Sequence, residues 1–332
     1  MAADLPALQG KAGLPRIALT GATGFVGRHL LAQLGATGSV VTALARPYPG
    51  RVLNDSADLH WIQGDLDTAG ALNDLTAGAD VVVHLAGATK ALSRSAFHQV
   101  NAAATAGLVQ AARRAGVGHF ILLSSLAATR PWVSPYAASK AAGEAAALEH
   151  AGAMPVTIVR APAVLGPGDQ ATVPLFALIA KGWLPVPGGR ARDGRFSMID
   201  VEDLSRLLAD LVVAGAGENR CIAPFGQQSL SWQDLADSGA RVTGRRVRQI
   251  VLPGPMLTLM GHGADLAAAL TRRPQVFSSG KTQEMMAGDW VADMPIVAPA
   301  PFDLTIRRCL APLLGLGTAP STPANNSDRS PE

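Results

Sequence analysis

Residues 16–34 read RIALTGATGFVGRHLLAQL, and this segment carries the strongest signal for the fold of the chain. A short apolar run at 16–20 precedes three glycines, and an apolar periodicity typical of a helix begins at Phe25. Glycines allow a sharp turn between strand and helix, and the first turn of a helix offers unpaired N–H groups to a phosphate. The stretch therefore predicts a strand, a helix and a phosphate-binding turn made by Gly21, Thr23, Gly24, Phe25, Val26 and Gly27.

The same alternation of strand and helix continues to about residue 160. Expected strands cover 40–45, 59–62, 80–85, 119–123 and 155–160, and expected helices cover 25–34, 69–76, 95–115 and 134–151. The strands are apolar on both faces, which is typical of a parallel sheet covered by helices on both sides. We therefore expect a doubly wound α/β domain.

The domain organisation follows from changes in composition along the chain. The α/β domain is expected over 16–165, with 196–225 returning to it, and a smaller substrate-binding region over 166–195 and 226–317. Small and apolar residues at 253–273 predict a helix around a pocket. The first fifteen residues are expected to form a flexible leader, and 318–332, which lack apolar side chains, a disordered tail.

Composition limits the class of protein. Of the 332 residues, 48% are hydrophobic and 16% charged, and the net charge is only +3, which argues against bulk disorder and against a dedicated nucleic-acid binder. The two cysteines stand far apart, so neither a disulfide framework nor a metal site is expected. No signal layout and no membrane-spanning run are recognised, which predicts a cytoplasmic protein.

A tyrosine and a lysine form the candidate catalytic pair. Tyr136 and Lys140 stand four residues apart in an expected helix, so both side chains lie on one face. A phenol is a poor base at neutral pH, and we expect two cations, the Lys140 ammonium and an oxidised nicotinamide, to lower the pKa of Tyr136. The phenol then exchanges a proton with a carbonyl or alcohol while hydride moves to or from a nicotinamide. Ser124 and Ser125 end the preceding strand at the sheet edge where such sites assemble.

The glycine spacing GxxGxxG, the YxxxK pair and the strand-end serine together resemble the short-chain dehydrogenase/reductase superfamily, in its extended, epimerase-like branch. The resemblance extends over about residues 16–310 and implies a Rossmann-like sheet with a smaller C-terminal substrate domain. It assigns Ser125 as the hydroxyl that polarises the substrate oxygen, with Ser124 as second choice. It further assigns nucleotide contacts to Asp65, Leu66, Leu85, Ala86, Gly87, Asn101, Tyr136 and Lys140. His84 ends a buried strand and is expected to be a packing residue, and Glu144 is expected to be a structural or surface acid.

The end of the second expected strand bears on the choice of nucleotide. An acid there holds the ribose hydroxyls of NAD, whereas a basic residue favours the 2′-phosphate of NADP. Here Arg46 follows Ala45 and no acid stands nearby, so NADP is preferred over NAD, with Arg28 as a helper.

Three readings of function remain open from the sequence. The first is reversible hydride transfer at a secondary alcohol or ketone, in net terms reduction of a bulky, apolar carbonyl. It is favoured by the apolar stretch 252–270, which is similar to 3β-hydroxysteroid dehydrogenase and dihydroflavonol reductase-like members. The second is a nucleoside-diphosphate-sugar epimerase or dehydratase with the same Ser-Tyr-Lys site and with Arg190, Arg192 and Arg195 near the phosphates. The third is a non-catalytic nucleotide-sensing or assembly protein.

The expected partner is a small-molecule substrate. The same apolar stretch, with Arg272 and Arg273 behind it, is also compatible with peripheral membrane contact. The resemblance implies a homodimer through the helices that bear Asn101 and Tyr136.

Overall fold

A seven-stranded parallel sheet forms the centre of the larger lobe. The computed structural model describes residues 13–49, 53–215 and 219–315, so the predicted tail at 318–332 and nearly all of the predicted leader lie outside the described residues. The strand order is β10-β6-β5-β4-β1-β2-β3. The strands are β1 (Ile17–Thr20), β2 (Val41–Ala45), β3 (Leu59–Gln63), β4 (Val81–His84), β5 (His119–Ser125), β6 (Val156–Ala161) and β10 (Arg220–Ile222).

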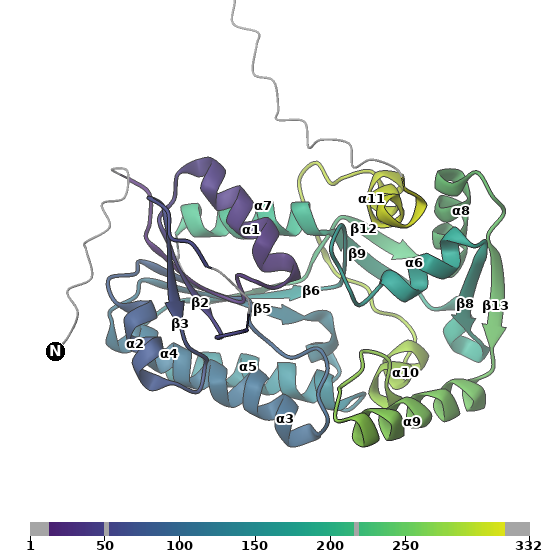
Figure 1. Cartoon of the computed structure of the whole chain (residues 1–332), viewed down its shortest axis with the longest axis horizontal. Coiled ribbons are helices and arrows are strands. Elements are labelled where there is room, and N and C mark those ends of the chain that lie inside the picture. Colours follow the sequence, from purple (N-terminus) through teal and green to yellow (C-terminus); the bar gives the residue numbers. More distant parts are fainter. Residues whose placement is uncertain (1–12, 50–52, 216–218, 316–332) are drawn as a thin grey trace, which may run out of the picture.

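Helices cover both faces of this sheet (Figure 1). On one face α1 (Phe25–Thr37) and α7 (Val201–Ala214) pack through Leu30, Leu34 and Leu204 against β1, β2 and β4. On the other lie α2 (Ala69–Thr76), α4 (Ala104–Arg114) and α5 (Pro135–Ala151). The predicted doubly wound α/β fold is confirmed. The strand order reverses between β1 and β4, and ligands of such sheets bind in the crevice at that point.

The helix predicted over 95–115 is not one regular helix. The structure has α3 (Arg94–His98), one π-helical turn at Gln99–Ala103, and then α4. The reason is the close approach of α5: a Cβ on Gly143 would lie 2.1 Å from the carbonyl oxygen of Asn101. The widened turn places Asn101 directly against α5, and sequence periodicity does not reveal such a contact.

The smaller lobe is built from short sheets and their helices. A three-stranded sheet contains β7 (Ala163–Leu165), β9 (Phe196–Asp200) and β12 (Gln227–Leu230), and β8 (Trp183–Pro187) pairs with β13 (Arg248–Leu252). A third pair joins β11 (Pro224–Phe225) and β14 (Met294–Pro295). Helices α6 (Val173–Ala180), α8 (Trp232–Thr243) and α11 (Phe302–Leu314) enclose a core that includes Phe176, Ile179, Leu184 and Ile306.

The segment 196–225, which was predicted to return to the larger domain, is divided between the two lobes. Within it, α7 and β10 lie in the larger lobe, whereas β9 pairs with β7 and β12, because β7 leads the chain directly out of β6.

The remaining helices, α9 (Gly254–Thr271) and α10 (Ser279–Met286), run along the lower edge towards α3 and α5 (Figure 1). No helix within the described ranges has the length and apolar character needed to cross a bilayer.

Candidate active site

The glycine-rich turn between β1 and α1 is shaped by close backbone approaches. Gly21 has φ +75°, and a Cβ there would lie 2.6 Å from the amide nitrogen of Ala86. A Cβ on Gly27 would lie 2.1 Å from the Gly21 carbonyl oxygen. Helix α1 begins at Phe25 with no side chain capping it, so the amides of its first turn are available to an anion. Thr23, Gly24 and Val26 lie in the same turn, which fits the pyrophosphate of a dinucleotide.

Residues at neighbouring strand ends extend this surface. Leu85, Ala86 and Gly87 follow β4, and the Ala86 amide donates to the Thr20 hydroxyl at 3.3 Å. Asp65 and Leu66 follow β3 and are half-buried. One oxygen of Asp65 already accepts bonds from the Asp67 amide and the Thr68 hydroxyl.

The two basic candidates differ in their surroundings. Arg46 is exposed directly after β2. Arg28 instead donates to the Thr23 carbonyl at 3.3 Å and to the Gly168 carbonyl at 3.5 Å. Arg46 is therefore the better placed of the two to meet a 2′-phosphate, while Arg28 holds the glycine turn to the segment after β7.

Asn101 is buried, and its amide group is fully engaged. Its Oδ1 accepts from the Ala88 amide at 2.7 Å, and its Nδ2 donates to the Ala88 carbonyl and to the Ser139 hydroxyl, each at 2.9 Å. Asn101 therefore orders the loop after β4 and joins it to α5. His84 is also buried, with its ring nitrogens bonded to Thr20 and Thr105, and burial lowers its pKa to about 3, so it is a packing residue.

Ser125 and Tyr136 are brought together at the end of β5 and the start of α5. The side chain of Ser125 accepts from the Ala127 amide at 3.2 Å. Burial raises the pKa of Tyr136 to about 12, a hydrogen bond with Ser125 opposes that rise, and the charge of Glu284 adds to it. Tyr136 is therefore fully protonated at neutral pH. Burial of the ring is the largest of these causes, and the charge of Lys140 is not among them, so a lowering of this pKa by Lys140 together with an oxidised nicotinamide stays a prediction.

Lys140 reaches the same region from one turn further along α5. Its Nζ donates to the Leu123 carbonyl at 2.8 Å, and a Cβ on Gly87 would lie 3.6 Å from that Nζ. Burial lowers the pKa of Lys140 to about 8, and the nearby charge of Glu144 opposes this shift. The ammonium is thus aimed at the loop where the nicotinamide-side ribose is expected.

Ser124, the second choice for the substrate-binding hydroxyl, is bound elsewhere. The Ser124 hydroxyl donates to Glu144 Oε1 at 2.5 Å. Arg160 pairs with the same carboxylate, with its Nε 3.0 Å from Oε1 and its terminal nitrogen Nη2 2.7 Å from Oε2. Glu144 is 5% exposed, so it is a structural acid rather than a surface one. This triad joins β5, α5 and β6 beneath the site, and it leaves Ser125 as the hydroxyl beside the phenol.

Glu284 is a functional candidate that sequence reasoning missed. It is buried on α10 and its Oε1 accepts from the hydroxyl of Ser134, the N-cap of α5, at 2.6 Å, across 150 residues of chain. Lys281 donates to its second oxygen at 3.1 Å. A lone glutamate in the sequence SSGKTQEM gives no signal for this contact, which depends on how α10 packs against α5.

Arg130 fixes the segment after α10 to the loop between β5 and α5. It donates to the backbone carbonyls of Ala287, at 3.0 Å, and Asp289, and its guanidinium lies 4.6 Å from the ring centroid of Trp290. The Trp290 indole in turn donates to the Glu284 carbonyl at 2.8 Å. The smaller lobe is therefore attached directly beside Ser125 and Tyr136.

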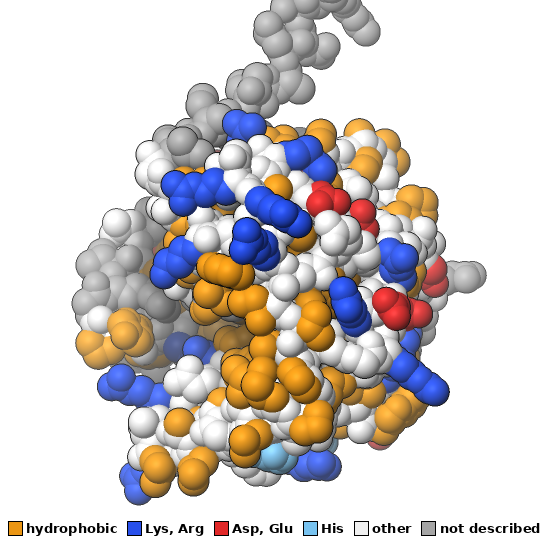
Figure 2. Space-filling view, turned by 90° about the vertical axis from the view of Figure 1, so that its right-hand side faces the viewer, with side chains coloured by type: hydrophobic (Ala, Val, Ile, Leu, Met, Phe, Trp, Pro, Cys, Tyr) orange, Lys and Arg blue, Asp and Glu red, His pale blue; other side chains and the backbone are white. Residues whose placement is uncertain are grey.

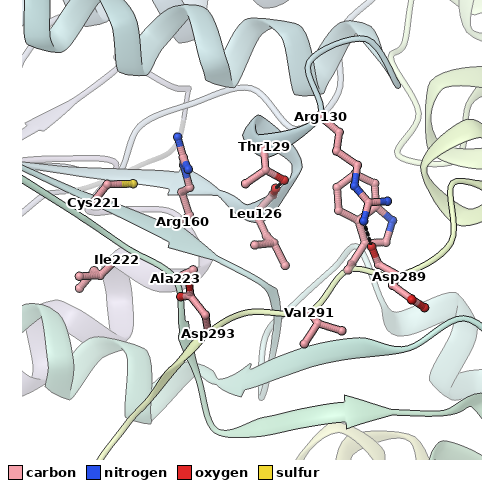
Figure 3. Close-up of a pocket in the computed structure, with 11 residues that line it drawn as sticks. Leu126, Thr129, Arg130, Arg160, Cys221, Ile222, Ala223, Asp289, Val291 and Asp293 are labelled. Carbon is pink, nitrogen blue, oxygen red and sulfur yellow. Dashed lines mark hydrogen bonds between the residues drawn. The ribbon is translucent and has the colours of Figure 1, made fainter.

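A cavity of about 210 Å³ lies beside the turn that follows β5 (Figure 3), and neither Ser125 nor Tyr136 is among the residues that line it. It is bounded by the turn after β5, the ends of β6 and β10 and the chain at 289–293; its lining includes Leu126, Thr129, Arg130, Arg160, Cys221, Asp289 and Asp293. The predicted helix at 253–273 is present as α9, but none of its residues lines this cavity, because α9 packs on the outer side of α10. Arg190, Arg192 and Arg195 are exposed and lie outside its lining. No group of three His, Cys, Asp or Glu side chains poised for a metal occurs in the described parts of the chain.

Comparison with known proteins gives this geometry a family. Residues 17–216 match the model of the NAD dependent epimerase/dehydratase family. The chain belongs to that family. A ceramide reductase of Caulobacter vibrioides is 38% identical over 294 residues, which cover 87% of this chain and 90% of the reductase. A UDP-glucose 4-epimerase of Vibrio cholerae is 27% identical over 78% of this chain and 86% of the epimerase.

A solved structure agrees at the level of the fold. The enzyme WbmH of Bordetella bronchiseptica, in complex with NAD+, superposes with a TM-score of 0.67 at 19% identity and covers 90% of this chain and 97% of its own. The relatives of this chain include a reductase, a dehydratase and an epimerase. The predicted family is confirmed, and the protein is an NAD(P)-dependent enzyme.

The two adjacent serines make separable predictions. Ser125→Ala removes the hydroxyl beside the phenol and should lower kcat by roughly 10²-fold or more with little change in the unfolding temperature. Ser124→Ala leaves the Glu144–Arg160 pair in place but removes one buried hydrogen bond to a charged group, so it should destabilise the fold by about 1.5–3 kcal/mol with a smaller effect on kcat. Steady-state kinetics and thermal unfolding of both variants check this, and the reverse pattern would contradict the assignment of Ser125.

The charge of Glu284 should be visible in the titration of Tyr136. The chain has only two tyrosines, so in a Tyr48→Phe background tyrosinate absorbance reports Tyr136 alone. Because the Glu284 carboxylate raises the pKa of the phenol, Glu284→Gln should move the titration midpoint downward from about 12. Glu149→Gln, an exposed acid at the far end of α5, is the matched control and should leave the midpoint in place. Equal midpoints in the two variants would show that Glu284 does not act on Tyr136.

Proposed function

We propose that the protein is an NADPH-dependent reductase that converts a ketone of a bulky, lipid-like substrate to a secondary alcohol. The observation that carries the reductive direction is the 38% identity to a ceramide reductase over 87% of this chain. Tyr136, whose pKa burial raises to about 12, holds its proton at neutral pH and can serve as the general acid.

The chain's own residues take distinct parts in this reaction. Bound nicotinamide nucleotide supplies the hydride that reaches the carbonyl carbon. Tyr136 gives its phenolic proton to the carbonyl oxygen, and Ser125, hydrogen-bonded to the phenol, donates a hydrogen bond to the same oxygen. Lys140, anchored on the Leu123 carbonyl, binds the ribose beside Gly87 and supplies positive charge. Asn101 keeps the loop at Leu85–Ala88 in place for that contact.

The nucleotide is bound along the edge that the glycine turn begins. Gly21–Gly27 at the start of α1 would hold the pyrophosphate, Asp65 and Leu66 the adenine, and Ala86 and Gly87 the nicotinamide side. Exposed Arg46 after β2, with no acid beside it, supports NADPH over NADH. A cytoplasmic location and a homodimer stay predictions.

The substrate class is supported by the relative with 38% identity, the ceramide reductase of Caulobacter vibrioides. That similarity extends through both lobes, because it covers 87% of this chain. A ketone next to long alkyl chains is therefore the substrate class to test first. A nucleoside-diphosphate-sugar epimerase or dehydratase is the alternative.

The deciding assay follows NADPH oxidation by the purified protein with a ketone form of ceramide, and product formation from UDP- and dTDP-sugars in parallel. We expect turnover of the lipid ketone, lowered roughly 10²- to 10⁴-fold by Tyr136→Phe because the general acid is lost. Tyr48→Phe, which alters the other, exposed tyrosine, is the control and should retain kcat. Turnover of a nucleotide sugar with tightly bound NAD released on denaturation would overturn the proposal in favour of an epimerase or dehydratase.

Arg46 gives a separate prediction about the nucleotide. A charge-assisted hydrogen bond contributes about 1.5–3 kcal/mol, so Arg46→Ala should reduce the NADPH-to-NADH affinity ratio by roughly 10-fold or more. Binding titrations with both nucleotides measure the ratio, and Arg307→Ala, an exposed arginine on α11, serves as control. An unchanged ratio in Arg46→Ala would remove Arg46 from the nucleotide site.

A further inference from the structure

One side of α9 is both apolar and exposed. At about 100° per residue, Met256, Leu259, Met260, Leu266 and Leu270 fall within one third of the helix circumference. Their exposed fractions range from 39% at Met256 to 78% at Leu270. Five large apolar side chains aligned along four turns of a surface helix require a partner that covers them.

The side of α9 roughly opposite the apolar stripe packs against the rest of the protein. Leu257, Gly261 and Ala268 are buried, and a Cβ on Gly261 would lie 2.8 Å from the Thr282 hydroxyl on α10. Asp265 accepts from the Ser279 amide at 3.3 Å. The apolar stripe is therefore presented to the outside by a helix that is firmly packed on its other flank.

The apolar surface continues onto the strand that leads into α9. Ile250 on β13 and Trp183 on the paired β8 lie on the same side of this two-stranded sheet and are 42% and 41% exposed. We call these residues together the apolar face: Trp183, Ile250, Met256, Leu259, Met260, Leu266 and Leu270. Figure 2 shows hydrophobic side chains gathered on this end of the molecule, with lysine and arginine side chains above them.

Positive charge flanks the apolar face at both ends. Between residues 244 and 276 the sequence has five arginines and one acid, Asp265, which is bound to the Ser279 amide. Arg245, Arg246 and Arg248 are exposed before and within β13, and Arg272 and Arg273 are exposed directly after α9. An apolar helix side with basic residues at its ends matches a surface that is apolar inside and anionic outside.

We propose that the apolar face docks on the surface of an anionic lipid bilayer. Helix α9 lies in the interface plane, with its leucines and methionines among the acyl chains and the arginines at the phosphates. Helix α10 packs between α9 and the Ser134 end of α5, so docking turns the Tyr136 end of the site towards the lipid, with α9 and α10 in between. Vesicle binding needs no turnover, so this inference stands or fails independently of the proposed reaction.

The test is co-sedimentation of the full chain with vesicles made of equal parts phosphatidylcholine and phosphatidylglycerol, against vesicles of phosphatidylcholine alone. We expect binding to the anionic vesicles, at least tenfold weaker binding to the neutral ones, and loss of binding as salt rises. Leu259→Glu combined with Leu266→Glu should reduce binding at least tenfold. Val213→Glu combined with Val297→Glu changes two other exposed apolar residues, which lie elsewhere, and is the matched control.

Thermal unfolding verifies that both double variants fold. Absence of binding to the anionic vesicles would overturn the proposal, and so would equal binding by the two double variants, because the lipid would then contact another surface. Light scattering provides the last arm: a dimer that Leu259→Glu with Leu266→Glu dissociates would show that a second copy of the chain covers the apolar face, which also overturns the proposal.

Discussion

Helix α5 lies so close to the π-helical turn at Gln99–Ala103 that only a hydrogen fits at position 143. This contact fixes the height and rotation of α5 against the sheet. Asn101 then reaches Ser139 on one side and the backbone of Ala88 on the other. Lys140, about one helical turn before Gly143, donates to the Leu123 carbonyl, and its Nζ lies close to Gly87. The positions of the phenol, the ammonium and the loop after β4 all depend on this one close approach.

Burial, more than ion pairing, determines the protonation of Tyr136 and Lys140. The acid that is fully paired, Glu144, lies one layer below, where it accepts from Ser124 and pairs with Arg160. Above that layer, burial favours the neutral form of both Tyr136 and Lys140 and moves their pKa values in opposite directions, to about 12 and about 8. The site therefore holds its proton on the phenol until a ligand changes the local field.

The smaller lobe acts on the site through α10. Ser134, which caps α5, donates to Glu284, and Arg130 holds the chain that follows α10 by two carbonyls and the face of Trp290. Helix α9 packs on the side of α10 that faces away from α5. The exposed leucines and methionines of α9 therefore lie on the same side of the molecule as the Ser134 end of α5. The lobe thus links the reacting groups to the surface that we propose meets lipid.

The sequence alone determined the elements with strong local signals. Alternating apolar runs and helical periodicity predicted the parallel sheet and its covering helices, and the glycine spacing at Gly21–Gly27 predicted the turn before α1. The four-residue spacing placed Tyr136 and Lys140 on one helix face, because the helical repeat is a local property. Only the tertiary structure decided the π-helical turn at Asn101, the capture of Ser124 by Glu144, the pKa of Tyr136 and the approach of Glu284. Each of these depends on burial and on contacts between residues distant in sequence, which local periodicity does not encode.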